Sequence, residues 1–71
     1  MEIIKEIQKN QKEKIIISVN EYKGHKYVDL RVHFEDERTK DYLPSKKGVA
    51  LSAKVLPEIM EAVLEGYEAI K

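Results

Sequence analysis

Residues 22–51, YKGHKYVDLRVHFEDERTKDYLPSKKGVAL, carry the pattern that decides the fold. Within them, Lys26 to Phe34 alternate apolar and polar residues, which is typical of a strand with one buried face. Gly24 precedes this segment and is free to adopt positive φ, so Tyr22 to His25 are predicted to form a hairpin turn. The segment before the turn, Lys14 to Tyr22, alternates in the same way. Two antiparallel strands are therefore expected at the centre of the fold.

The two faces of this hairpin have different chemistry. One face is aliphatic and comprises Ile15, Ile17, Val19, Val28, Leu30 and Val32. The other face is polar, aromatic and cationic, with Ile16, Ser18, Asn20, Tyr22, Tyr27, Asp29, Arg31 and His33. Strict alternation puts Phe34 on the aliphatic side, so it reaches the polar face only if the strand bulges or ends just before it. Asp29 and Arg31 share the polar face, two residues apart on one strand, and this spacing favours an ion pair between them over a general-base role for Asp29.

Two more short strands are predicted after a charged loop, at Lys40 to Leu43 and Lys46 to Leu51, with Gly48 permitting a bend. Pro44 separates them and suits a sheet edge or a bulge. Ahead of this domain (residues 14–71), residues 1–13 form an arm. Its isoleucines stand at helical spacing and predict a short helix or an ordered extension: Ile3, Ile4 and Ile7.

A C-terminal helix is predicted from Ser52, the candidate N-cap. Pro57 then requires either a kink or a start one turn later. The apolar positions recur every three or four residues with glutamates between them, and they form a band wider than one small sheet can cover. A second copy of the chain is expected to cover the rest, with an interface at Val55, Ile59, Met60, Val63, Leu64 and Tyr67. The predicted class is α+β: a four-stranded antiparallel sheet, then a helix, paired as a homodimer.

Composition narrows the possible functions. The chain has 71 residues and no cysteine, which allows one domain without disulfides and with a thin core. The net charge is zero, but residues 1–48 carry 11 Lys and Arg against 9 Asp and Glu. Apolar runs are too short for a membrane span and no signal peptide follows Met1, so a cytoplasmic location is expected. No nucleophile–base pair, phosphate loop or third metal ligand accompanies the histidines, so no enzyme, cofactor or metal site is predicted.

The polar face has the composition that an unpaired nucleic-acid strand needs. Bases stack on aromatic rings, here Tyr22, Tyr27 and Phe34, while cations follow the phosphates. The candidate cations are Lys23, His25, Lys26, Arg31, Lys46 and Lys47. The alternative to nucleic-acid binding is that the lysines only belong to solvated turns and the aromatic residues are ordinary strand residues. It stays open because 37% of the residues are charged and aromatic residues are common in strands.

Three motifs in this order resemble the single-stranded-DNA-binding domain of the transcriptional positive cofactor four family. They are Tyr22-Lys23-Gly24, Asp29-Leu30-Arg31 followed by His33-Phe34, and the segment from Pro44 to Leu51 with Lys47-Gly48 at its centre. The resemblance covers roughly residues 14–70. It differs at several positions, where the family usually has lysine at His25, tryptophan at Phe34, tyrosine at His33 and lysine at Leu43.

The resemblance implies a strongly curved sheet, dimerisation through the helices, and paired grooves for unwound DNA. It assigns base stacking to Tyr22 and Phe34, and contacts to phosphates and base edges to Lys23, Arg31, Lys46 and Lys47. The expected function is sequence-independent binding of single-stranded DNA, including unwound or mismatched duplex, in transcription, replication, recombination or repair. The expected setting is a bacterial cytoplasm, or a host cytoplasm for a phage protein. Alternatives are an adaptor that recruits a polymerase or recombination protein, and an RNA-binding protein.

Overall fold

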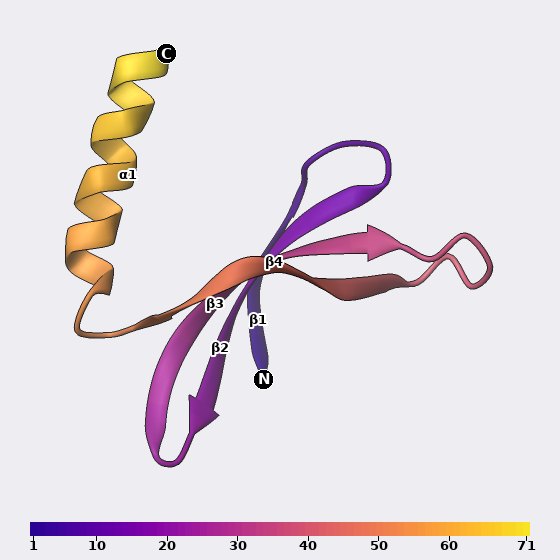
Figure 1. The fold of residues 1–71 in the computed structure, drawn as a ribbon, viewed down its shortest axis with the longest axis horizontal. Coiled ribbons are helices and arrows are strands. Elements are labelled where there is room, and N and C mark those ends of the chain that lie inside the picture. Colours follow the sequence, from indigo (N-terminus) through magenta and orange to yellow (C-terminus); the bar gives the residue numbers. More distant parts are fainter.

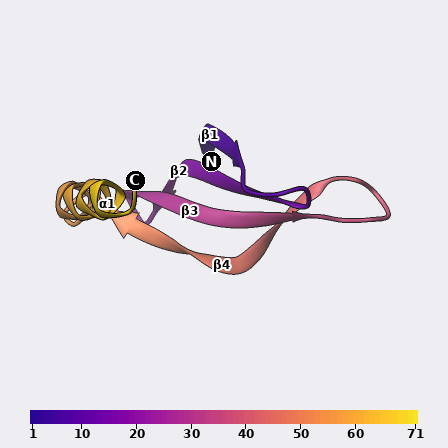
Figure 2. The same cartoon turned by 90° about the horizontal axis from the view of Figure 1, so that it is seen from above.

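The computed structural model describes residues 1–71 as one open sheet and one helix (Figure 1). The elements are β1 (Glu2–Gln8), β2 (Glu13–Tyr22), β3 (His25–Glu35), β4 (Tyr42–Ser52) and α1 (Leu56–Ile70). All three strand pairs are antiparallel, and the sheet order is β1-β2-β3-β4. The predicted α+β class is therefore confirmed. The sheet is curved and strongly twisted, and α1 lies beyond one end of it (Figure 2).

The fourth strand comes from a segment whose isoleucine spacing favoured a helix. Residues 2–8 form β1, which pairs along the outer edge of β2, with Ile7 opposite Ile15. The helical interpretation of residues 1–13 is therefore wrong. Its spacing of Ile3, Ile4 and Ile7 also fits a strand with one irregularity, since the register shifts between Ile3 and Lys5. β-branched residues suit such an edge position, and the free edge of β2 supplies the partner.

The two short strands predicted on either side of Pro44 are in fact one strand, β4. Arg31 pairs with Gly48 and His33 with Pro44, so Val32 of β3 lies opposite the three residues 45–47. We call these three residues, Ser45, Lys46 and Lys47, the β4 bulge. Pro44 lies in an edge strand, as its missing N–H requires. The bulge therefore allows one strand to pass the proline without losing its partner.

The helix begins one turn after Ser52, which is one of the two alternatives that Pro57 left open, and the prediction of Ser52 as the N-cap is wrong. Val55 is the N-cap, and Pro57 lies in the first turn, where its missing N–H costs no intrahelical hydrogen bond. Residues 53–55 form a turn closed by the Val55 N–H on the Ser52 carbonyl at 3.2 Å. With 15 residues, α1 falls short of the length and apolarity that a membrane crossing requires.

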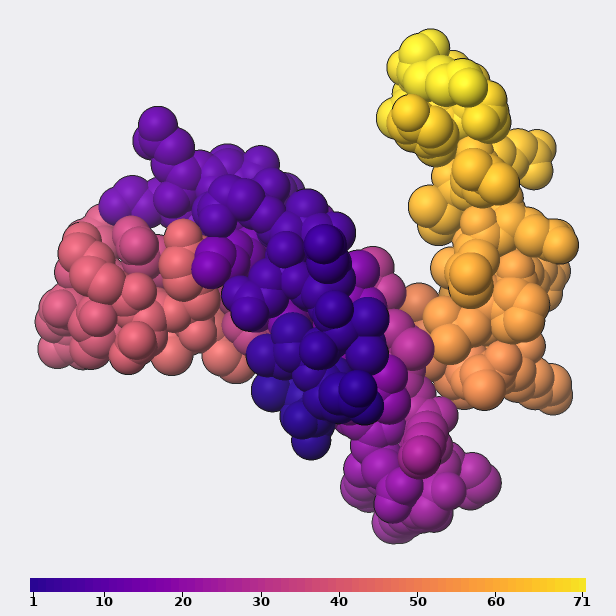
Figure 3. All heavy atoms as spheres, turned by 180° about the vertical axis from the view of Figure 1, so that it is seen from behind, coloured from indigo at the N-terminus to yellow at the C-terminus, as the bar shows by residue number.

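The single chain buries only three residues, and they lie on both sides of the sheet. Ser18 and Ile16 are 3% and 8% exposed on the polar side, and Leu51 is 8% exposed on the apolar side. The aliphatic side is covered less well, and no residue of α1 is buried. In the space-filling view the helix stands apart from the sheet with a deep notch between them (Figure 3).

Candidate functional site

The β2–β3 hairpin gathers four of the predicted binding residues at one end of the sheet. Lys23 and Gly24 form a two-residue turn with φ of 51° and 80°, and Tyr22 pairs with His25 across it. Positive φ at both central positions is what a tight hairpin needs, and it explains the glycine. The hollow beside the turn, about 560 Å³ in volume, is lined by Tyr22, Lys23, His25, Lys26, Tyr27, Ala50 and Ser52.

A second hollow, of about 530 Å³, crosses all four strands on the polar face. Its floor includes Ser18, whose hydroxyl accepts a hydrogen bond from the Asn20 amide at 2.9 Å. Tyr27, His33 and Tyr42 contribute rings to its wall. Tyr42 was not selected from the sequence, because the sequence does not show how its strand pairs with the neighbouring strand or which face its ring is on.

Arg31 lies at the centre of this face and is already paired. Its Nη2 and Nε donate to the two carboxylate oxygens of Asp29 at 2.8 and 3.1 Å, which confirms the predicted ion pair. The hydrogen bond to Asp29 raises the pKa of the Arg31 guanidinium above its ordinary value, so the charge is permanent. The third nitrogen, Nη1, donates to the Ser45 carbonyl at 3.3 Å. Arg31 thus ties β3 to the β4 bulge.

Gly48 gives the Arg31 side chain its space at this crossing. A Cβ at Gly48 would lie 2.4 Å from the Leu30 carbonyl oxygen and 2.9 Å from Cζ of Arg31. Both distances are shorter than van der Waals contact. The lysine–glycine pair of the sequence motif therefore has a packing reason, with Lys47 on the exposed bulge and Gly48 beneath the guanidinium.

The lysines near the β1–β2 turn and those predicted to bind differ in their pairing. Those near the β1–β2 turn are neutralised: Lys9, Lys12 and Lys14 each lie within 4.0 Å of a glutamate oxygen. The four lysines predicted to bind form no salt bridge and are exposed, namely Lys23, Lys26, Lys46 and Lys47. The Lys23 ammonium lies 5.4 Å from the centre of the Tyr22 ring. Unpaired positive charge therefore lies at the hairpin and at the bulge, and also at Lys5 of β1, Lys40 of the β3–β4 loop and Lys54 before α1.

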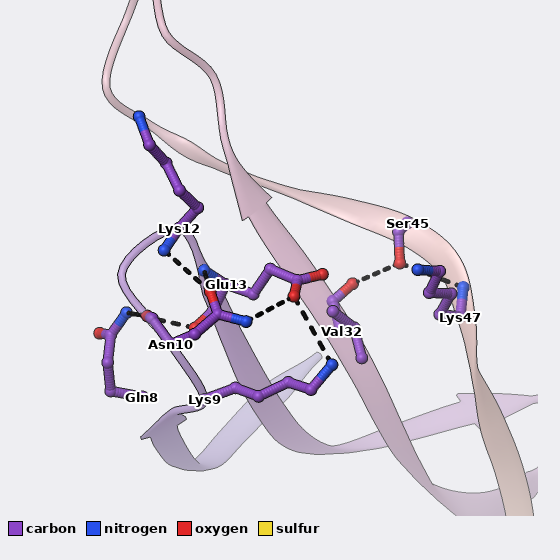
Figure 4. A network of polar contacts seen from close by, with 8 residues as sticks. All are labelled: Gln8, Lys9, Asn10, Lys12, Glu13, Val32, Ser45 and Lys47. Atoms are coloured by element: carbon purple, nitrogen blue, oxygen red, sulfur yellow. Dashed lines mark hydrogen bonds and ion pairs between the residues drawn. The ribbon is translucent and has the colours of Figure 1, made fainter.

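The neutralised group surrounds a compact polar network at the β1–β2 turn (Figure 4). The Asn10 side-chain oxygen accepts the backbone N–H groups of Lys12 and Glu13, both at 2.9 Å. Its amide donates to the Glu13 carboxylate at 2.7 Å. This hydrogen bond, helped by the charge of Lys9, lowers the pKa of Glu13 below its ordinary value.

Phe34 lies apart from the other predicted binding residues. β3 continues without a bulge to Glu35, and Phe34 pairs with Glu13 and Leu43, so it shares the side of Val32. It is 42% exposed there. Tyr22 lies at the opposite end of β2, about 30 Å away along the strand. Within one chain, the two residues assigned to stacking do not form one surface.

The predicted dimer residues form the helix side of an apolar cleft. This cleft has a volume of about 710 Å³, and all nine of its lining residues are hydrophobic. Leu30, Val49 and Leu51 line its sheet side, and Leu56, Ile59, Met60, Val63, Leu64 and Tyr67 line its helix side. Val55, the N-cap, is not among them.

Two comparisons with known proteins find relatives of this chain. The family model described as "Transcriptional Coactivator p15 (PC4)" matches residues 9–62, which leaves β1 outside the match. A PC4 homolog from Burkholderia pseudomallei, solved in a tetragonal crystal form, is 29% identical with a TM-score of 0.85, covering 93% of this chain and 96% of that one. The orthorhombic form gives the same identity and TM-score and covers 93% and 88%. No curated protein matches the sequence.

Proposed function

This chain belongs to the transcriptional coactivator p15 (PC4) family, and from that premise we propose that it binds single-stranded DNA as a homodimer. The family is a DNA-binding one of coactivator type. The finer proposal is that unpaired strands bind the polar side of the sheet without sequence preference. Lysines would contact phosphates, and tyrosines would stack on bases.

The observation that carries the proposal is the separation of paired from unpaired lysines. Lys23 and Lys26 flank the hollow beside Tyr22 and Tyr27, while Lys46 and Lys47 stand on the β4 bulge, which follows Pro44, a lining residue of the second hollow. None of the four lysines forms a salt bridge, although the chain has as many acidic as basic residues. Unpaired cations beside rings suit a polyanion that carries flat bases.

The homodimer follows from the uncovered apolar surface. Met60 and Val63 are 65% and 66% exposed on a helix with no buried residue, and they face an entirely apolar cleft. A chain of this size with three buried residues lacks a sufficient core of its own. Pairing of two helices about a two-fold axis would cover both clefts with the same residues. It would also double the cationic surface.

The test is a titration of a fluorescent oligo-dT about 20 nucleotides long, longer than a single-strand site. Binding should be micromolar or tighter, and weaker for a duplex of equal length. If about five phosphates are neutralised, log affinity should fall with log salt at a slope near −3.5. Absence of binding at low salt would overturn the proposal and leave the adaptor role. An RNA oligomer of equal length, run in parallel, decides between DNA and RNA.

A further inference from the structure

The β4 bulge is held in place by hydrogen bonds of partly buried groups. The Ser45 hydroxyl donates to the Val32 carbonyl at 2.6 Å and accepts the Lys47 backbone N–H at 3.1 Å (Figure 4). The Ser45 carbonyl accepts Nη1 of Arg31, which is fixed in turn by Asp29. We call Asp29, Arg31 and Ser45 the clasp. It joins the bulge to β3 where the β3–β4 ladder is interrupted.

From these contacts we propose that the clasp positions Lys46 and Lys47 for phosphate binding, with Ser45 as a positioning residue. A bulge of three residues opposite one has no regular ladder to fix its backbone. The Ser45 hydroxyl supplies two of the missing hydrogen bonds, one on each side of the gap. Holding the Lys47 backbone reduces the freedom that phosphate binding would otherwise remove.

The same contacts change the role of Arg31. Three of its five N–H donors are engaged with Asp29 and Ser45, and its side chain is 24% exposed. Because the Asp29 carboxylate already pairs with its charge and only two N–H donors remain, Arg31 has less to offer a phosphate than an unpaired lysine. Arg31 therefore acts through the bulge, and the free ammonium groups of the two lysines make the contacts. This inference rests on the proposed function, because it assigns roles within the same binding surface.

The experiment is a double-mutant cycle on oligo-dT affinity with Ser45→Ala and the pair Lys46→Ala/Lys47→Ala. Ser45→Ala alone should weaken binding about fivefold at about 0.1 M salt, the worth of one phosphate contact. In the background without the lysines, Ser45→Ala should change affinity by less than about twofold, because the residue acts only through them. Equal losses in both backgrounds would overturn the proposal. Ser45→Thr keeps the hydroxyl and should retain binding.

Thr39→Ala is the matched control. Its hydroxyl accepts the N–H of the residue two positions on, Asp41, at 3.2 Å, as Ser45 does for Lys47. It lies in the β3–β4 loop, away from the bulge. Its removal should leave affinity unchanged. An effect equal to that of Ser45→Ala would assign the loss to general loosening of the β3–β4 connection and overturn the clasp.

Amide hydrogen exchange separates failure of the clasp from failure of the proposed function. Without any DNA, Ser45→Ala should speed exchange at the Lys47 amide while the β2–β3 ladder stays protected. Unchanged exchange at Lys47 would overturn the clasp even if the protein binds DNA. Faster exchange in a protein that binds no oligonucleotide would overturn the proposed function instead, and with it the clasp's role in binding.

Asp29→Asn tests the role of Arg31 by the direction of the effect. If Arg31 contacts phosphate, releasing it from a carboxylate should strengthen binding. If Arg31 positions the bulge, affinity should fall about twofold to fivefold although a negative charge has been removed. A rise in affinity would overturn this part of the proposal.

Discussion

On the polar side of the sheet, Ile16 and Ser18 are buried by the strands around them, whereas on the apolar side only Leu51 is buried, Val49 is 49% exposed and α1 has no buried residue. The polar side also satisfies its own hydrogen bonds: no buried side-chain nitrogen or oxygen lacks a partner. The chain can therefore complete its polar face alone, but its apolar face needs more surface than it has. For a small open sheet, the face that looks like a core by composition is the one left for a partner.

The largest expected effect comes from a charge on the apolar face. Leu64→Asp places a carboxylate in a cleft lined only by hydrophobic residues, where burial without a partner costs several kcal/mol. The mass in solution, measured by light scattering, should fall from that of a dimer to that of one chain. Thermal stability should fall with it, since so little of the chain is buried alone. Ala62→Asp, with the same charge on the opposite side of α1, should remain dimeric. A dimeric Leu64→Asp protein would mean that this face is not the interface.

The next largest effect is expected from a substitution at Gly48, where β3 and β4 approach each other closely. Gly48→Ala puts a methyl group against the Leu30 carbonyl and should cost about 1–3 kcal/mol of unfolding free energy in urea. Gly66→Ala is the matched control, because nothing lies within 4 Å of its Cβ position on the helix. It should stabilise the protein by up to about 1 kcal/mol. Equal effects at the two glycines would show that the close approach at Gly48 is unimportant.

The third prediction compares free lysines with paired ones. Replacing Lys46 and Lys47 by alanine should weaken oligo-dT binding about 20-fold at about 0.1 M salt and make the salt slope shallower by about 1.4. Replacing Lys9 and Lys12, which already face glutamates, should change either quantity far less. If the two pairs behave alike, binding depends on total charge and not on this surface.

The smallest expected effect concerns acid stability at the β1–β2 turn. The pKa of Glu13 is lowered in the folded state, so its carboxylate contributes stability above its ordinary pKa. That contribution is lost as pH falls through the lowered value. Asn10→Ala removes the principal hydrogen bond and should return the pKa of Glu13 toward its ordinary range, as measured by NMR titration. An unshifted Glu13 titration would place the cause elsewhere.

The parts of the fold that could be predicted from sequence depend on local pattern. Alternation from Lys14 to Phe34 and the freedom of Gly24 specify the central hairpin, and Pro57 limits the helix to a kink or a late start, of which the structure has the late start. Residues 2–8 were open to misinterpretation, because the spacing of Ile3, Ile4 and Ile7 fits the period of a helix and also that of a strand with one irregularity. Pairing with the free edge of β2 decided between them.

The parts of the candidate site that sequence missed depend on register. Nothing local indicates that Tyr42 faces the hollow on the polar face, or that three residues of β4 oppose Val32. The role of Ser45 follows from that bulge and was invisible without it. By contrast, the Asp29–Arg31 pair needs only the two-residue repeat of a strand, and it was predicted.

The tight Lys23-Gly24 turn has a consequence for how the two faces are kept apart. It sets the pairing of β2 with β3 along ten consecutive positions, from Tyr22 opposite His25 to Glu13 opposite Phe34. Because side chains alternate with a period of two, a slip of one position would exchange Arg31 for Leu30 on the polar side. A single residue inserted between Lys23 and Gly24 that shifts this pairing by one position would therefore place the polar side chains of β3 on the apolar side of the sheet.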